Sequence, residues 1–200
     1  MSKANKSNKA IKYRLYPNDE QKVMFAKTFG CCRFVYNQLL TLQKQRYKDG
    51  ESHLSKLKSN EFATRTLKKD YDFLKEIDKF AVSNAVFHLA DAYDRFFKKQ
   101  NHFPKFKSKR KSKKSYTTNF TNNNILIGKN VIKLPKVGMV KAVIHKLPKD
   151  DWKLKSVTVS QDSVGNYFAS VLFEYEQEDI PSVSKSSTNA IGLDYKSDGL

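Results

Sequence analysis

The chain has 200 residues, and its 38 Lys and Arg outnumber its 20 Asp and Glu, which gives a formal net charge of +18. This excess favours a polyanionic partner, with nucleic acid ahead of an anionic membrane surface. No apolar run is long enough to span a membrane, and residues 1–9 lack the apolar segment of a secretory signal. The adjacent Cys31 and Cys32 form neither a disulfide framework nor a zinc site, so we expect a protein of the reducing cytosol.

The first predicted element is a half-buried strand over residues 10–16, in which apolar and polar side chains alternate. Asn18 and Gln21 then form a capping-box-like helix start. One strand is not stable alone, and its only partners would lie beyond residue 120. Residues 18–114 are therefore predicted to be an insertion between the first and second strands of one β-domain.

Apolar residues recur at helical spacing over residues 19–47. Gly30 interrupts this run and could split it into two helices. Such a break, followed by Arg33 and Asn37, gives a helix-turn-helix-like outline. Most helix pairs of this kind are only packing units, so Arg33 and Asn37 are weaker candidates for ligand contact.

Two further helices and a set of strands complete the predicted elements. Helices are expected over 54–69 and 81–98, and the apolar stripe of the second, including Tyr93 and Phe97, is assigned to the core. After residue 116 the period becomes two, and hairpins are expected over 125–134 and 154–176, with another strand between them. The pattern predicts an antiparallel barrel or a curled sheet.

Residues 98–114, the basic tract, contain nine Lys and Arg and no acidic residue. Such a charge density repels itself unless an anion neutralises it. Phe103 and Phe106 within the tract could add base stacking to phosphate contacts, although a solvated loop is the alternative. The predicted contacts with nucleic acid are Lys105, Lys107, Lys109, Arg110, Lys111, Lys113 and Lys114, with Arg14, Arg33 and Asn37 as weaker candidates.

The last stretch, residues 190–195, is predicted to be a short strand that follows a serine-rich linker. On it, Asp194 shares a face with two small residues, which leaves room for a cation. Carboxylate oxygens suit Mg²⁺ and metal-dependent chemistry on nucleic acid. The alternative is that Asp194 begins a turn.

Seven segments, in this order and spacing, resemble the TnpB (OrfB) proteins of small bacterial transposons, which are compact relatives of type V CRISPR nucleases. The segments are KYRLYPN at 12–18, GCCRFVYN at 30–37, AYDRFF at 92–97, FPKFK at 103–107, LPKVG at 134–138, GNY at 165–167 and IGLD at 191–194. The resemblance covers nearly the whole chain.

The resemblance implies an α+β fold: a wedge-like antiparallel β-barrel, interrupted by a helical, helix-turn-helix-like insertion and followed by the first strand of an incomplete RuvC-type (RNase-H-like) domain. The expected divisions are a first barrel strand (1–17), a helical recognition lobe with the basic tract (18–114), the rest of the barrel (115–180), a linker (181–189) and a truncated start of the nuclease domain (190–200).

The same resemblance implies an RNA-guided DNA endonuclease that binds guide RNA and target DNA in the bacterial cytoplasm, at the nucleoid. Asp194 matches the first nuclease carboxylate of the family and would bind a metal only in a completed nuclease domain. Mg²⁺ is expected for the full family protein and no cofactor for this chain alone, because the later carboxylates and a four-cysteine segment are not in it. We therefore expect binding without cleavage. Two alternatives stay open: one half of a split nuclease with a separate C-terminal half, and a stand-alone helix-turn-helix DNA-binding regulator.

Overall fold

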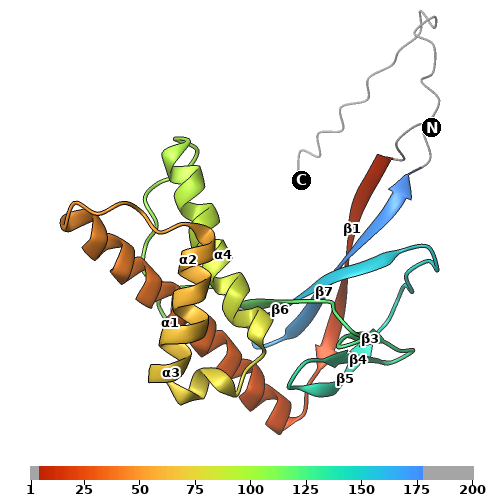
Figure 1. Ribbon diagram of the computed structural model, residues 1–200. Coiled ribbons are helices and arrows are strands. Elements are labelled where there is room, and N and C mark those ends of the chain that lie inside the picture. Colours follow the sequence, from red (N-terminus) through yellow and green to blue (C-terminus); the bar gives the residue numbers. More distant parts are fainter. Residues whose placement is uncertain (1–4, 178–200) are drawn as a thin grey trace, which may run out of the picture.

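The computed structural model describes residues 5–177, in which helices gather on one side of the molecule and strands on the other (Figure 1). In chain order the elements are β1 (Asn5–Tyr16), α1 (Asp19–Lys48), α2 (Lys56–Glu61), the π-helical η1 (Phe62–Leu67), α3 (Lys68–Asp70), the 3-10 turn η2 (Asp72–Lys75), α4 (Lys79–Phe97), β2 (Lys114–Asn119), β3 (Leu126–Ile127), β4 (Val131–Leu134), β5 (Gly138–Val143), β6 (Lys153–Gln161) and β7 (Tyr167–Gln177).

The seven strands form one antiparallel sheet in the order β2-β6-β7-β1-β5-β4-β3. β1 is central and pairs with β7 on one side and with β5 on the other. Both partners lie beyond residue 120, as predicted, so α1 to α4 come between two strands of the same sheet. The fold is therefore α+β, and both predicted hairpins are present.

The sheet is open, so the predicted barrel is not confirmed. Its two edges are β2 and the two-residue β3, which do not pair with each other. The edge strand β2 was not predicted, and it lies against the helices: the Asn84 side chain of α4 donates to the Thr117 carbonyl at 2.9 Å. Residues 181–189, the strand 190–195 and Asp194 lie outside the described residues, and the domain divisions stay predictions.

α1 is one continuous helix, which corrects the predicted break at Gly30. The predicted capping box is present: the Asn18 side chain accepts from the Gln21 amide at 2.8 Å, and the Gln21 side chain accepts from the Asn18 amide at 3.1 Å. One glycine inside a helix costs about 1 kcal/mol relative to alanine. Burial of a long apolar face outweighs that cost, because Phe25, Val35 and further residues along α1 are inaccessible to solvent. No turn therefore interrupts α1 at Gly30.

The helices pack on the inner face of the sheet through aromatic rings. Phe25 of α1 lies 5.4 Å from the ring of Tyr167 and 6.3 Å from that of Tyr116. α4 buries Tyr93 as predicted, but Phe97 is 62% exposed, which corrects its assignment to the core. Phe97 is the last residue of α4, so its ring lies at the exposed end of the helix. None of the helices in residues 5–177 is long and apolar enough to cross a membrane.

Candidate nucleic-acid interface

The basic tract runs from the end of α4 to the start of β2, and a side chain from α1 holds its middle. The Asn37 amide nitrogen donates to the Lys107 carbonyl, and the Lys107 backbone N–H donates to the Asn37 Oδ1, both at 2.9 Å. Both ends of the Asn37 amide are therefore engaged inside the protein. This pairing positions the tract.

A turn closed by two serines shapes the next part of the tract. The Ser108 amide donates to the Ser112 hydroxyl at 2.9 Å, and the Lys111 amide donates to the Ser108 hydroxyl at 3.0 Å. Serine hydroxyls commonly replace backbone partners in such turns. The turn leaves Lys109, Arg110 and Lys111 exposed at the surface. Lys105 is exposed as well, so these four predicted contacts are accessible to a large partner.

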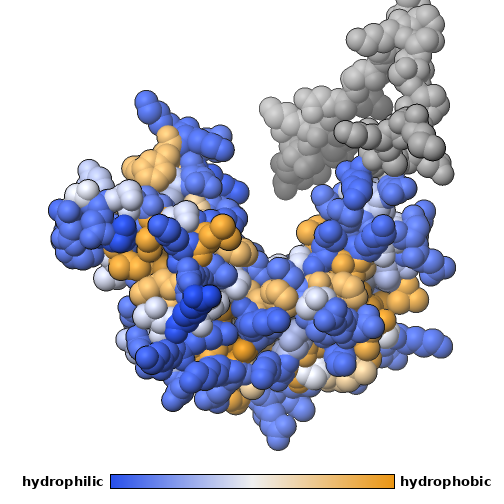
Figure 2. All heavy atoms as spheres, viewed as in Figure 1, coloured by the Kyte–Doolittle hydropathy of each residue, from blue (hydrophilic) through white to orange (hydrophobic). Residues whose placement is uncertain are grey.

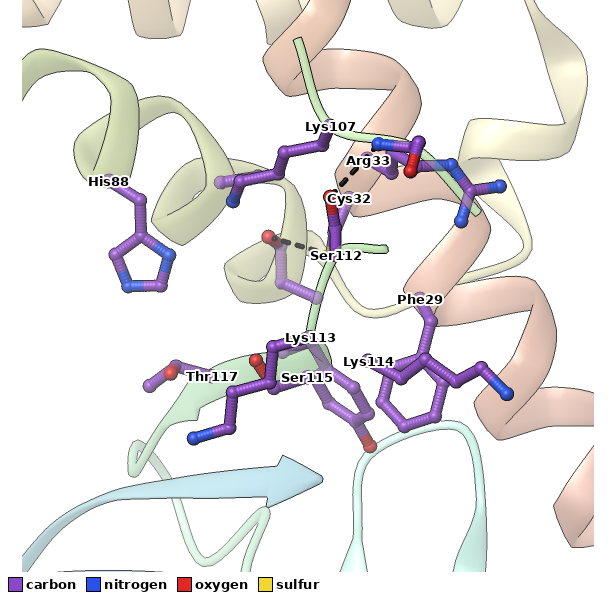
Figure 3. A pocket seen from close by; sticks show the side chains of 14 residues that line it. Phe29, Cys32, Arg33, His88, Lys107, Ser112, Lys113, Lys114, Ser115 and Thr117 are labelled. Carbon is purple, nitrogen blue, oxygen red and sulfur yellow. Dashed lines mark hydrogen bonds between the residues drawn. The ribbon is translucent and has the colours of Figure 1, made fainter. Parts of the chain in front are cut away.

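A small groove, with a volume of about 40 Å³, lies between the tract, α1 and α4. Arg33 borders it from α1, His88 borders it from α4, and the tract contributes Lys107, Lys113 and Lys114 (Figure 3). In this view the amino groups of Lys107 and Lys113 lie on the side of His88, whereas Arg33 and Lys114 extend to the opposite side. Four of the predicted cations thus border one groove, which we call the basic groove.

The cations of the tract are not neutralised within the described part of the chain. Eight ion pairs occur there, and none includes a residue of the tract. The Lys107 ammonium lies 4.0 Å from the centre of the Tyr36 ring, and burial lowers its pKa. Burial, followed by the nearby Lys107, also lowers the pKa of His88. A bound anion would relieve both effects, since it favours the charged form of each group.

Arg14 does not border the basic groove. It lies on β1, where its guanidinium donates to the Asn166 side chain and stands 5.0 Å from the centre of the Phe168 ring. Asn166 is in turn fixed by Asp162 in the turn between β6 and β7, through a bond of 2.9 Å. Arg14 therefore braces this turn.

Two residues near the tract were not selected from the sequence. His88 borders the basic groove from α4, on the same helical face as Ala81 and Ala85; its place there depends on the fold and has no motif in the sequence. Lys44 of α1 stands over the rings of Phe103 and Phe106, at 5.5 and 4.6 Å from their centres. No local pattern connects Lys44 to rings about sixty residues further along the chain.

Residues 5–177 contain no candidate metal site. They contain no group of three or more His, Cys, Asp or Glu side chains that could hold an ion. Cys31 and Cys32 are free and buried in α1, as expected for small apolar residues. Burial raises the pKa of Cys32 to about 12, so this thiol is not a ready metal ligand or nucleophile.

Comparison with known proteins places these features in a family. Residues 7–52 match a family model for a helix-turn-helix domain of the OrfB (IS605) type; in the structure this range holds β1 and α1. A protein of Streptomyces pristinaespiralis named "Putative RNA-guided DNA endonuclease" is 30% identical over 188 residues, which are 93% of this chain and 45% of the relative.

Two further relatives are similar over different shares of their length. The "Putative RNA-guided DNA endonuclease InsQ" of Escherichia coli (strain K12) is 29% identical over 192 residues, 92% of this chain and 44% of InsQ. The "Virulence protein VsdF" of Salmonella dublin is 32% identical over 111 residues, 50% of this chain and 93% of VsdF. The chain thus spans less than half of the length of the two endonuclease-named relatives. It belongs to the TnpB (OrfB) family of transposon proteins and corresponds to the N-terminal part of its members.

Proposed function

We propose that this chain binds guide RNA and target DNA through the basic tract and the basic groove, as the nucleic-acid-binding part of a TnpB-type protein of the bacterial nucleoid. The observation that carries the proposal is an ordered surface of cations without carboxylate partners among the described residues. Such a surface releases counterions when phosphates replace them, which is the main source of affinity for nucleic acid. The names of the two endonuclease relatives support RNA and DNA as the polyanions.

The stand-alone helix-turn-helix regulator is less well supported. That mode of binding needs a second helix free to enter the major groove, and α1 is unbroken where the turn was expected. The Asn37 side chain, which such a helix would present, is engaged with Lys107. We therefore assign the contact surface to the tract.

The proposal concerns binding and assigns no cleavage step to residues 5–177. Two-metal hydrolysis needs several carboxylates around the ions, and the described residues contain no such cluster. Cleavage with Mg²⁺ at Asp194 would need further carboxylates from a completed nuclease domain, in the same chain or in a separate C-terminal half. With Mg²⁺ and RNA present, a protein ending at residue 200 should bind DNA and leave it uncut.

A salt titration tests the proposal. Binding of labelled RNA and duplex DNA would be followed by fluorescence anisotropy between about 50 and 200 mM salt. The triple variant K109Q/R110Q/K111Q removes three unpaired cations at the exposed turn. We expect weaker binding to every sequence, and a slope of log K against log salt that is shallower by about 2 to 3, since each lost phosphate contact contributes about 0.7 to 0.9.

The matched control is K22Q/K27Q/K75Q, which removes the same charge from lysines that already face Asp19, Glu76 and Asp72. This control should retain most of the affinity and the slope. Equal losses in the two triple variants would show that binding follows net charge alone, and an unchanged slope in the tract variant would place the interface elsewhere.

A further inference from the structure

A second and larger pocket lies where the far ends of α1 and α4 meet the start of the basic tract. It encloses about 550 Å³, within the range of roughly 300–1,000 Å³ typical of ligand pockets. Its wall is mainly aromatic: Tyr47, His53, Tyr93, Phe96, Phe97 and Phe103. We call it the aromatic pocket. Figure 2 shows hydrophobic surface exposed on the arm formed by the ends of these two helices.

The wall of the aromatic pocket is built from rings that fix one another. Phe103 stands edge-on to Tyr93 and to Phe96, with ring centres 5.6 and 5.2 Å apart. Tyr93 stacks on Phe97 at 6.1 Å and receives the edge of His53 at 4.5 Å. These contacts hold the rings in place without a ligand, so the pocket is preformed.

Two rings of the pocket are more open to solvent than Phe103, which is 41% exposed. Tyr47 is 85% exposed and Phe97 is 62% exposed. Clustered aromatic surface of this kind marks an interaction site on a soluble protein. Each open ring offers a flat face of the size on which a planar ligand can stack.

The charged residues beside the aromatic pocket indicate which kind of ligand it would bind. Lys44 and Lys48 border it, and Lys44 also stands over Phe103 and Phe106 of the basic tract. Glu51 is the acidic residue on its border, and Arg46 already pairs with it. An apolar peptide would leave the lysines without counter-charges. A nucleotide supplies both a flat base for the rings and a phosphate for the lysines.

We propose that the aromatic pocket holds an unpaired base of an RNA or DNA strand whose backbone follows the basic tract. The tract carries Phe103 into the pocket wall, so a strand lying along the tract would reach the open rings directly. A base inside a duplex is already stacked on its neighbours and cannot enter. The inference rests on the proposed function, because the tract must hold the strand.

The test uses the double variant Tyr47→Ala and Phe97→Ala, which removes the two most exposed rings of the pocket and no cation. The probes are a single-stranded RNA, a single-stranded DNA and a duplex of the same sequence, each with 2-aminopurine as the reporter base. We expect binding of one or both single strands to weaken about fivefold or more. Duplex binding and the salt slope should not change, and the fluorescence change of 2-aminopurine in the single strand should be lost.

Leu57→Ala is the matched control, since Leu57 is a 79% exposed apolar residue of α2 outside the pocket. It should bind all probes like the unmodified chain, and thermal unfolding would confirm that all variants fold. Tyr47→Ala alone is the second variant if the pair does not fold. Single-strand binding that survives loss of both rings, or an equal loss on duplex, would overturn the inference. If the ring variants gave either result while K109Q/R110Q/K111Q still weakened binding, the proposed function would stand and the pocket would have no part in it. A chain that binds none of the probes would contradict both the proposed function and the pocket.

Discussion

The helices α1 to α4 and the basic tract are both rich in lysine and arginine, but their cations face different surroundings. On the helical side, Lys27 lies 2.8 Å from Glu76 and Lys56 lies 3.2 Å from Asp91. Such exposed pairs add only about 0–1 kcal/mol of stability each. Six of the fourteen Lys and Arg of residues 19–97 have such a carboxylate partner, whereas none of the nine in the tract has one within residues 5–177. The location of unpaired charge, more than its total, therefore indicates the binding surface.

The two regions also differ in what keeps them ordered. The helices are held by their own backbone hydrogen bonds and by an apolar core. The tract has an irregular backbone, and it depends on a few side chains such as Asn37, Ser108 and Ser112. A small change to these side chains should therefore affect the tract strongly and the helices little.

Asn37→Ala should have the largest effect, because it removes both hydrogen bonds to the Lys107 backbone. Leaving partly buried polar groups without partners costs about 1–3 kcal/mol. We expect the free energy of unfolding, from urea titration, to fall by that amount. Nucleic-acid affinity should fall too, although no charge is lost. Gln45→Ala is the control on the same helix, since its exposed amide donates to the Asp49 carboxylate; a loss of equal size there would contradict the role given to Asn37.

Gly30→Ala should strengthen the helical side alone, by about 0.5–1 kcal/mol. The added methyl group has room, because the nearest heavy atom outside the local backbone would be the Arg33 guanidinium at 4.0 Å. Urea unfolding measures the gain, and binding should be unchanged. Gly138→Ala is the opposite control: its φ of +82° strains any other residue, so stability should fall. A loss in Gly30→Ala would mean that the helix needs flexibility at this point.

Much of the fold could be predicted from the sequence because its signals are local. Alternation gave β1 and the hairpins, and helical spacing gave α1 and α4. The continuity of α1 could not be predicted, since it depends on tertiary burial of Phe25 and Val35 outweighing the cost of Gly30. That the sheet stays open could not be predicted either, because closure depends on whether strands far apart in the chain pair with each other. β2 was missed because Lys114–Asn119 is mostly polar.

The candidate site, too, could be predicted only in part. Its cations were visible as a dense run of lysine, but the arrangement that orders them was not. Asn37 and Lys107 are seventy positions apart, and nothing near either residue predicts their pairing. The aromatic pocket was hidden too, because Phe97 continues the apolar stripe of α4, and only the end of the helix leaves its ring exposed.

His88 gives the smallest expected effect, and it tests whether the basic groove holds an anion. Its pKa is lowered by burial and by Lys107, and Asp91 opposes the shift. His88 is therefore neutral at pH 7, and it gains charge as the pH falls below the ordinary histidine value of about 6.5. A phosphate in the groove would favour the charged form, so affinity should rise a few-fold as the pH is lowered through this range.

Without nucleic acid, lowering the pH has an unfavourable effect through His88, this time on the stability of the fold. The unfolded chain binds the His88 proton more tightly than the folded chain, so this group lowers stability as the pH falls through the window below about 6.5. His88→Gln should remove both effects, while His145→Gln, which changes a histidine beside Tyr13 on the sheet side, should keep them. If His88→Gln followed the same pH profiles as the unmodified chain, phosphates would contact the exposed turn of the tract without entering the groove.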